Sequence, residues 1–382
     1  MIPFTDEQRM LQKMVAKLAM EKIRPLAKGA DETGKSSPEI LQLLSKNGLF
    51  KMGLPEAYGG IGANYSTIAL VLEELAKVDA STAMILFASQ TLIQILNQWG
   101  SPKLKERFYG YLSDAFKINA FCLTEPDHGS ESAAIQTSAI LKGDHYIING
   151  RKIFITNGDI AHLFLVFVRT GEGERHKGLS AILIEKNTPG FSIGKHEDKL
   201  GLRGSDLAEL MFEDAFVSSR NLLGSPGQGW QILTTSGSDM RAYGPGAISV
   251  GLAQGALDYA VSYSRERIQF GIPIAKLQAI RFMLADMSIQ LEAARSLLYR
   301  TTTMMDAKAG DRTERDRLIS STKCFASDTA MKITTDAVQI LGGYGVMKDY
   351  PVERMMRDAK MIQIFDGTNQ IQRVIVAKNL LN

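Results

Sequence analysis

Hydrophobic residues recur with a helical period in the first and last parts of the chain, and with the shorter period of strands between them. From residue 2 to about 117, apolar positions repeat at three- and four-residue spacing, as in Leu11, Met14, Val15 and Leu18, which is typical of a helix with one buried face. From about residue 228 the same period returns. There it predicts three long helices, over residues 247–267, 277–307 and 314–341.

Between these two zones, from about residue 118 to 224, short β-branched and aromatic runs alternate with turn residues. The runs cover residues 146–148, 152–155, 163–168 and 179–184. Asn149-Gly150 predicts a hairpin whose far strand ends at Thr156, and the whole zone predicts an antiparallel barrel or sandwich. We therefore expect the order α, β, α, with domains at residues 1–117, 118–226 and 227–382.

The composition is that of an ordinary globular protein and narrows the possible functions. Of 382 residues, 45% are hydrophobic and 22% are charged, which is enough for a large core in two or three domains. The net charge of +3, with scattered basic residues, gives no support to nucleic-acid binding. No apolar run reaches the length of a membrane span, and the five histidines lack the spacing of metal ligands.

The cysteines and the first residues indicate a compartment. Cys122 and Cys324 are far apart in the sequence, so we interpret them as buried or inert thiols in a reducing compartment rather than as a redox pair. Thr5, followed by two acids, is typical of a helix start and not of a signal or transit peptide. These features predict a cytoplasmic protein.

Asp366 is the strongest candidate for chemistry. It stands between the apolar pair Ile364-Phe365 and the turn residues Gly367-Thr368. A carboxylate held against apolar walls becomes more basic, as a general base for a weak carbon acid requires. The alternative is that Asp366 caps the last helix while Thr368 hydrogen-bonds locally, and on this segment alone the capping interpretation is favoured.

Three further segments have residues that suit a ligand. Thr124 to Ser132 follows a strand directly, so its backbone donors and hydroxyls suit a flat heterocycle, although a plain strand-to-loop turn fits equally well. Arg267 suits bidentate phosphate contact, but the helix dipole also favours a cation at a helix C-terminus. A glycine cap accounts for one glycine of the 342–345 segment, which has three.

Taken together and in this order, these segments resemble the flavin-dependent acyl-CoA dehydrogenases over essentially the whole chain. The resemblance implies an α+β fold with an N-terminal helical domain, a middle β-barrel and a C-terminal four-helix bundle. It also implies FAD as cofactor, an acyl-CoA substrate, an electron-transfer flavoprotein as acceptor, and a homotetramer built as a pair of dimers.

The resemblance assigns roles to individual residues. Thr124 and Thr156 correspond to contacts with the flavin ring, and Phe154 replaces the usual Trp as an aromatic wall. Arg267 and Gln269 correspond to pyrophosphate and adenosine contacts made across a subunit interface. The complete set of expected cofactor residues is Leu123, Thr124, Ser130, Phe154, Thr156, Arg267, Gln269, Phe270, Gln339, Gly343, Thr368 and Gln370. The expected substrate residues are Gln90, Thr91, Ser132, Arg241, Tyr243 and Gly367.

The implied reaction is removal of the α-proton by Asp366 and of a hydride from the β-carbon to flavin N5. The residue 366 backbone N–H and the ribityl chain would stabilise the thioester carbonyl. Many members of the family carry Glu at this position, and the shorter Asp withdraws the carboxylate by about 1.5 Å. Some members place the base on a central helix, where this chain has Met240, while the adjacent Asp239 is expected to point elsewhere.

The shorter base suggests a bulkier α-carbon, and cyclohexane-1-carboxyl-CoA is a candidate substrate. A flavin oxidase of the nitroalkane-oxidase type, which also uses an aspartate, is the alternative function. A noncatalytic, DNA-associated flavoprotein is a more distant alternative, because its relatives usually carry extra C-terminal sequence and a basic face.

Overall fold

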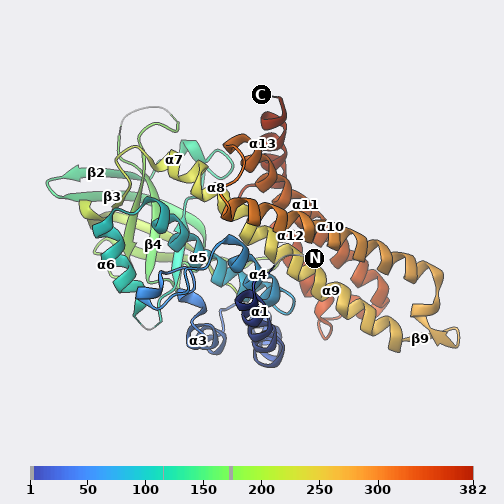
Figure 1. Ribbon diagram of the computed structural model, residues 1–382. Coiled ribbons are helices and arrows are strands. Elements are labelled where there is room, and N and C mark those ends of the chain that lie inside the picture. The colour runs from blue at the N-terminus through green and yellow to red at the C-terminus, as the bar shows by residue number, and fades with distance from the viewer. Residues whose placement is uncertain (1–3, 115, 172–174, 382) are drawn as a thin grey trace.

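The computed structural model describes residues 4–114, 116–171 and 175–381, and it shows a β-rich part flanked by helices (Figure 1). The N-terminal helices are α1 (Asp6–Leu18), α2 (Arg24–Thr33), α3 (Pro38–Lys46), α4 (Tyr65–Ala76), α5 (Ala80–Trp99) and α6 (Pro102–Ser113). The strands of the middle part are β1 (Asn119–Cys122), β2 (Ser138–Lys142), β3 (His145–Thr156), β4 (Leu163–Arg169), β5 (Leu179–Glu185), β6 (Phe191–His196), β7 (Leu207–Ser218) and β8 (Leu222–Leu223).

The C-terminal part consists of long helices with one short hairpin. Its helices are α7 (Gly229–Thr234), α8 (Ser236–Arg241), α9 (Ala247–Glu266), α10 (Gln278–Asp306), α11 (Arg312–Leu341), α12 (Pro351–Ile362) and α13 (Asn369–Leu381). A two-stranded hairpin of β9 (Ile268–Gln269) and β10 (Ile272–Pro273) joins α9 to α10 at the end of the molecule opposite the β part (Figure 1). The three long helices predicted from the sequence are confirmed, each within two residues at either end.

The first helix begins as its sequence predicts. The hydroxyl of Thr5 accepts a hydrogen bond from the backbone N–H of Gln8, whose side chain accepts one from the backbone N–H of Thr5. This reciprocal cap satisfies two amide groups that the helix itself cannot use.

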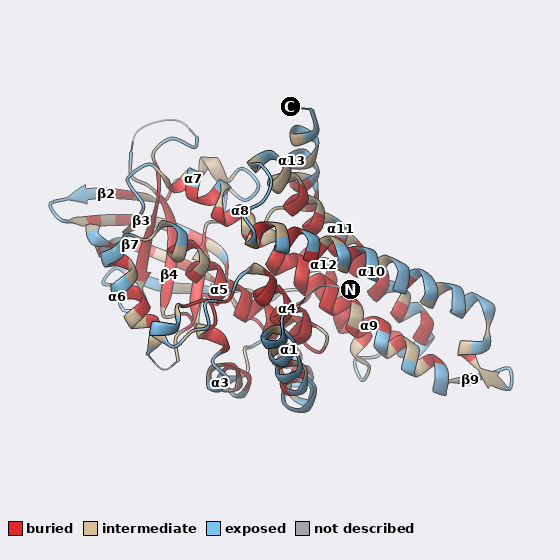
Figure 2. Ribbon diagram, in the orientation of Figure 1, coloured by how far each residue is buried: buried red, intermediate tan, exposed pale blue. Residues whose placement is uncertain are grey.

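Helices α4 and α5 form a buried layer between the β part and the C-terminal bundle. Helix α4 packs on α9 and α10, while α5 packs on β1 and α8. Both helices are buried over most of their length, as the red ribbons of Figure 2 show. Within the described residues, no helix combines the length and the hydrophobicity needed to span a bilayer.

The strands form one strongly curved sheet in the order β6-β7-β3-β2-β4-β5-β8, with β1 paired to β4. Phe164 of β4 and Phe191 of β6 lie far apart in this order, yet their ring centroids are 4.8 Å apart, so the sheet folds over its own core. The prediction of an antiparallel sheet is confirmed for most strand pairs, including β4 with β5, but it is wrong for two, because β4 runs parallel to β1 and, at Ser138 and Arg169, to β2. The long 123–137 connection between β1 and β2 allows both strands to run in the same direction as β4.

The hairpin predicted at Asn149-Gly150 is also wrong, because β3 runs through this position without turning. The two residues form a bulge against β7 instead. Gly150 has a φ of 143°, and a Cβ there would lie 2.7 Å from the Thr137 hydroxyl. The Asn149 side chain donates to the Asp214 carboxylate at 2.9 Å and accepts from its backbone N–H at 2.8 Å. Contacts with distant strands therefore override the local turn preference.

Candidate active site

Asp366 lies on the short turn between α12 and α13. Its φ is 53°, and Gly367 follows with a φ of 83°, so two consecutive residues adopt the left-handed region. This conformation is strained for an aspartate and persists only where the surroundings enforce it. Glycine suits position 367 because of this φ, and a Cβ there would also lie 2.6 Å from Nε2 of Gln372.

The backbone carbonyls of this turn are held by side chains from three helices. Arg241 of α8 donates from Nε to the Asp366 carbonyl at 3.1 Å. Lys323 of α11 donates from Nζ to the Gly367 carbonyl at 3.0 Å, and Gln372 of α13 donates from Nε2 to the same carbonyl at 3.0 Å. The turn is therefore fixed from several sides while its carboxylate takes no part in holding it.

The carboxylate of Asp366 has the environment of a base. Its Oδ2 atom is buried and has no hydrogen-bond partner among the described residues. Burial raises the pKa of Asp366 to about 6, against the opposing effect of the Lys323 and Arg241 charges. A carboxyl of this pKa is largely ionised at neutral pH and more basic than an exposed aspartate.

The alternative interpretation, in which Asp366 caps the last helix and Thr368 hydrogen-bonds locally, is correct for Thr368 only. Thr368 hydrogen-bonds locally, because its hydroxyl accepts from the backbone N–H of Ile371 at 3.3 Å and so caps α13. Asp366 does not cap the helix, since its side chain accepts no described hydrogen bond.

The central helix supplies no second base. Met240 is buried, and the neighbouring Asp239 accepts a hydrogen bond from Arg312 at 3.2 Å. This ion pair agrees with the prediction that Asp239 points elsewhere, which stays a prediction. Tyr243 follows in a π-helical segment (Ala242–Gly246), where it is fully buried and stacks on Tyr65 with ring centroids 5.3 Å apart.

The residues expected at the flavin ring lie together at the end of β3. The pairing of β3 with β7 is irregular between Lys152 and Ile155, and within this irregularity Phe154 has a φ of 57° and is 54% exposed. Strand β3 joins the loop after β1 through a hydrogen bond from the Ile153 N–H to the Thr124 carbonyl, at 2.9 Å. A strained backbone that presents an aromatic face is typical of a ligand contact.

A buried ion pair fixes this loop. Lys152 donates from Nζ to Glu125 Oε1 at 2.8 Å and to the Leu123 carbonyl at 3.0 Å. The Glu125 carboxylate also accepts from the backbone amides of Gln136 at 2.5 Å and Thr137 at 2.9 Å. Burial favours the neutral acid, but Lys152 and these amides outweigh it and hold the pKa of Glu125 below its usual range. The Lys152–Glu125 ion pair therefore orients Leu123 and the following residue, Thr124.

The residues expected at the adenosine half lie at the opposite end of the bundle. Arg267, Gln269, Phe270 and Gly343 line one cavity of about 600 Å³ beside the β9–β10 hairpin. The Arg267 guanidinium lies 5.3 Å from the centroid of the Tyr344 ring. Two groups of expected cofactor residues therefore lie on different parts of one chain (Figure 1).

The remaining expected residues vary in how free their side chains are. Gln90 is buried and donates to the carbonyls of Leu49 and Phe50, so its side chain is committed within the helical part. Thr91 donates to the carbonyl of Phe87 at 3.0 Å. Ser130, Gln339 and Gln370 are exposed, and Ser132 is partly buried.

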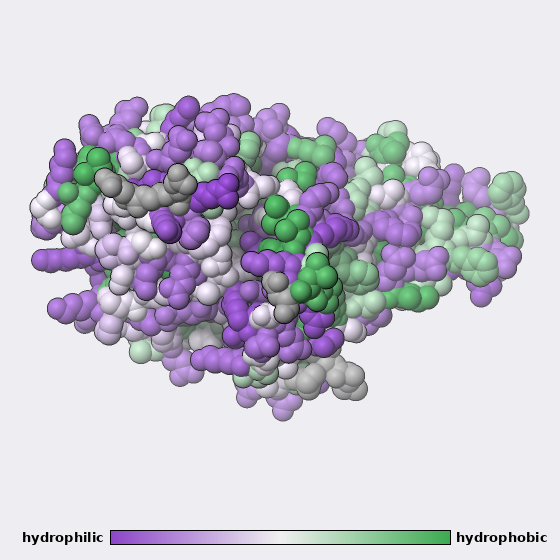
Figure 3. All heavy atoms as spheres, turned by 90° about the horizontal axis from the view of Figure 1, so that it is seen from above, coloured by the Kyte–Doolittle hydropathy of each residue, from purple (hydrophilic) through white to green (hydrophobic). Residues whose placement is uncertain are grey.

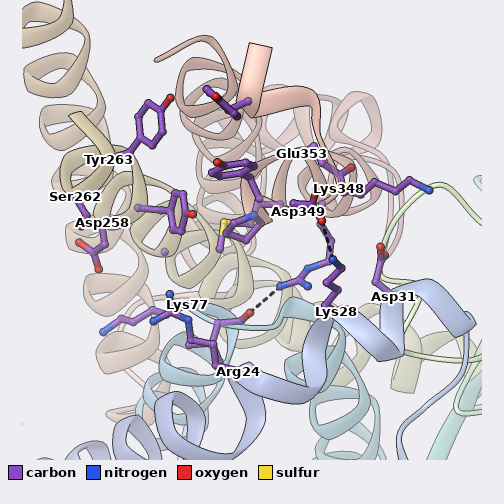
Figure 4. A pocket seen from close by; sticks show the side chains of 18 of the residues that line it. Arg24, Lys28, Asp31, Lys77, Asp258, Ser262, Tyr263, Lys348, Asp349 and Glu353 are labelled. Carbon is purple, nitrogen blue, oxygen red and sulfur yellow. Dashed lines mark hydrogen bonds and ion pairs between the residues drawn. The ribbon is translucent and has the colours of Figure 1, made fainter. Parts of the chain in front are cut away.

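A larger cavity, of about 810 Å³, lies elsewhere, between α2, α9 and α12 (Figure 4). Its charged side chains carry both signs, and several pair with one another, as Lys28 does with Asp349 at 3.1 Å. None of the 364–370 residues lines it. Size alone therefore does not identify the site of chemistry.

Lys323 and Gln372 were not predicted from the sequence. One signal for Lys323 was present, because it shares a helix face with Ile319, Ala326 and Ala330, all buried. A lysine on an apolar face needs a buried acceptor. Both cysteines are free, Cys122 buried and Cys324 partly buried, and burial raises the pKa of each thiol; that the thiols are inert stays a prediction.

Comparison with known proteins gives this fold and site a family. Three family models match the chain in order: the acyl-CoA dehydrogenase N-terminal domain at residues 5–114, its middle domain at 120–215 and its C-terminal domain at 227–381. The fold is thus that of a family of flavin-dependent oxidoreductases. The chain belongs to the acyl-CoA dehydrogenase family, which confirms the predicted enzyme class and α+β fold.

Individual relatives agree with this assignment. A cyclohex-1-ene-1-carbonyl-CoA dehydrogenase of Syntrophus aciditrophicus is 45% identical over 99% of this chain and 90% of its own. The butyryl-CoA dehydrogenase structure from Megasphaera elsdenii is 39% identical, with a TM-score of 0.94 over 99% of each chain. A structure from work on the electron-transferring flavoprotein of Acidaminococcus fermentans is 40% identical, with a TM-score of 0.95 over 100% of each chain. A further structural neighbour, 29% identical with a TM-score of 0.90 over 99% of this chain and 98% of its own, is an FAD complex, in line with the FAD dependence of the family.

Proposed function

We propose that this enzyme dehydrogenates the α,β-bond of a cyclic or α-branched acyl-CoA, with Asp366 as the base that removes the α-proton. One observation carries the proposal: Oδ2 of Asp366 is buried and unpaired on a strained turn whose carbonyls are bound by other side chains. A carboxylate without hydrogen-bond donors keeps its basicity for substrate.

The same turn offers donors for the thioester. The backbone N–H groups of Asp366 and Gly367 donate to none of the described residues. Because the carbonyls of this turn are bound, its amides are the polar backbone groups left for a ligand. An amide that meets the thioester oxygen as charge develops contributes about 3 kcal/mol to the transition state. The two functions, proton removal and carbonyl stabilisation, would then come from adjacent atoms of one turn.

FAD supplies the redox chemistry when bound, by accepting the hydride that leaves the β-carbon. The residues present fit a flavin ring, because Phe154 offers an exposed aromatic face in strained backbone beside the Thr124 loop. Thr156, Thr368 and Gln370 complete this half of the proposed site. Arg267, Gln269, Phe270, Gln339 and Gly343 would hold the adenosine half from a second copy of the chain.

A homotetramer is consistent with the surface of the bundle. Apolar residues, green in Figure 3, gather over the helical end of the molecule, whereas the β end is mostly polar. The exposed large apolar residues of the C-terminal part include Ile268, Phe270, Phe282, Ile289, Val374, Leu380 and Leu381. Apolar surface on this scale is typical of protein interfaces. We also propose an electron-transfer flavoprotein as acceptor, and the cytoplasm as location because both thiols are free.

The preference for a bulky acyl group rests on the length of the base. Asp366 is one methylene shorter than glutamate, which leaves about 1.5 Å more room at the α-carbon. A cyclohexene-carbonyl-CoA dehydrogenase among the relatives supports a ring in this space. The preference is proposed for this chain on these two grounds.

Anaerobic titration with a panel of acyl-CoAs tests the proposal. Cyclohexane-1-carboxyl-CoA, cyclohex-1-ene-1-carboxyl-CoA and isobutyryl-CoA should bleach the flavin faster than butyryl-CoA. Asp366→Glu should lose turnover on the cyclic thioesters or shift toward straight chains. Faster turnover of the cyclic substrates by the glutamate variant would overturn the size argument. Rapid reoxidation by air with no response to any acyl-CoA would instead indicate an oxidase.

A further inference from the structure

We infer that Lys323 is a positioning residue for the base, and that it acts through its charge more than through its hydrogen bonds. The inference rests on the proposed role of Asp366. Lys323 projects from the middle of α11 and is fully buried, with a relative exposure of 0%. An ammonium group in such a place costs several kcal/mol of desolvation unless its surroundings compensate it.

The contacts of Lys323 place its charge under the turn. Its Nζ donates to the Gly367 carbonyl at 3.0 Å and to Asn369 Oδ1 at 2.8 Å. It makes no ion pair within 4.0 Å among the described residues, so no carboxylate neutralises it directly. The ammonium is therefore a buried positive charge that contacts Gly367, the residue that follows Asp366 in the chain.

Other groups also hold the two acceptors of Lys323. The Gly367 carbonyl has a second donor, because it also accepts from Gln372 at 3.0 Å. Asn369 is held through its amide nitrogen, which donates to Ser327 and to Asp328 at 2.9 and 2.7 Å. Both acceptors therefore keep described contacts without the lysine, so charge is the property that only the lysine adds here.

The charges of Lys323 and of Arg241 on α8 both act on the Asp366 carboxylate, and Arg241 also donates to the Asp366 backbone carbonyl. Tyr243 is also close enough to feel the carboxylate, and it is neutral because burial raises its pKa. Around Lys323 itself the titratable neighbours with the largest effects include Asp366, Cys324, Arg241 and Asp328. Burial alone would push the pKa of Asp366 upward, and the two cations oppose this. Without Lys323, more of the base would be protonated at neutral pH.

The test is the pH dependence of flavin reduction by acyl-CoA in the holoenzyme of Lys323→Met. We expect the acid limb to move upward by about one to two pH units, from the loss of one charge at this range in a partly screened interior. At pH values well above the limb, the rate should return close to that of the unmodified enzyme. A purely structural lysine would instead lower the rate at every pH.

Two comparison variants make the outcome specific. Lys323→Arg keeps the charge and should leave the limb in place. Lys332→Met removes an exposed lysine of the same helix that pairs with Asp336 at 2.7 Å, and it should change nothing. If Lys323→Met does not fold, Lys323→Gln, which can still donate to the Gly367 carbonyl, carries the same test. The carboxyl band of Asp366, identified by infrared difference against Asp366→Asn, gives its pKa without any turnover.

The outcomes separate this inference from the proposed function. An unmoved limb and an unmoved carboxyl pKa in Lys323→Met, while Asp366→Asn is inactive, would overturn the role of Lys323 and leave the base standing. Full activity of Asp366→Asn would overturn the base itself. A limb that moves with Lys323→Met and stays with Lys323→Arg supports the inference.

Discussion

Two buried lysines in this protein lie near carboxylates whose pKa values are shifted in opposite directions, although each lysine charge lowers the pKa of its carboxylate. Lys152 in the β part donates directly to Glu125 at 2.8 Å, and the pKa of Glu125 is lowered. Lys323 in the bundle gives its described hydrogen bonds to a carbonyl and an amide oxygen, and the pKa of Asp366 is raised to about 6. Both lysines are 0% exposed, and burial lowers the pKa of each to about 8.

The difference lies in the hydrogen bonds that each carboxylate accepts. Glu125 accepts from two backbone amides besides its lysine, so its charge is fully used in holding a loop. Oδ2 of Asp366 accepts no described hydrogen bond, because the surrounding donors bind the backbone carbonyls of the turn instead. The same pair of residue types is therefore structural in one region and, as we propose, chemical in the other.

The largest expected effect separates the two carboxylates. Asp366→Asn should reduce the rate of flavin reduction by about 10²–10⁴-fold or more, since general-base catalysis is typically worth that much. Its thermal stability should stay the same or rise, because the variant removes a buried, unpaired charge. Glu125→Gln, the matched variant, should lose stability far more than it loses chemistry. Stopped-flow flavin reduction and thermal unfolding of both variants compare the loss of rate with the loss of stability. A fully active Asp366→Asn would contradict the proposed difference between the two carboxylates.

Lys152→Met should be the most destabilising lysine substitution. It leaves the Glu125 carboxylate buried without its partner, and breaking such a pair costs about 3–5 kcal/mol. Lys323→Met leaves no paired carboxylate behind, so its free energy of unfolding should change less. Urea unfolding of the two variants compares them directly. The double variant Lys152→Met with Glu125→Gln should recover part of the loss, and equal stability of the two single variants would contradict the distinction.

Acid should stop the chemistry before it loosens the fold. The pKa of Asp366 is raised to about 6, so the base is lost as pH falls through about 6. The pKa of Glu125 is lowered, so its contribution to stability is present above the unfolded-state value of about 4.3 and is lost only as pH falls through its lower folded value. The pH profile of kcat/KM, followed beside circular dichroism from pH 8 to 4, should show the rate falling first. Simultaneous loss of both signals would show that the acid limb reports unfolding.

The sequence is informative where one segment decides the structure. Helix ends follow local caps, and Asp366 is recognisable because its apolar neighbours and its glycine are adjacent to it in the chain. Asn149-Gly150 misleads because Thr137, in the connection before β2, and Asp214, on β7, decide its conformation.

The supporting groups of the turn are harder to predict for the same reason. Lys323 is 43 positions from Asp366 in the sequence, and nothing in its own segment says which acceptors its ammonium meets. Arg241 was expected to contact substrate, and in the structure it donates to the Asp366 carbonyl. Contacts that a second chain would make leave no local pattern beyond an exposed residue such as Phe270.

The smallest expected effect comes from a third pair of the same chemistry at the surface. Lys28 and Asp349 are 3.1 Å apart, at the rim of the large cavity, and their side chains are 52% and 82% exposed (Figure 4). Lys28→Met should change the free energy of unfolding by less than about 1 kcal/mol, because water and salt screen an exposed pair. Urea unfolding at low and high salt measures it beside Lys152→Met. A loss as large as that of the buried pair would mean that pairing itself, rather than burial, sets the cost of removing a lysine in this fold.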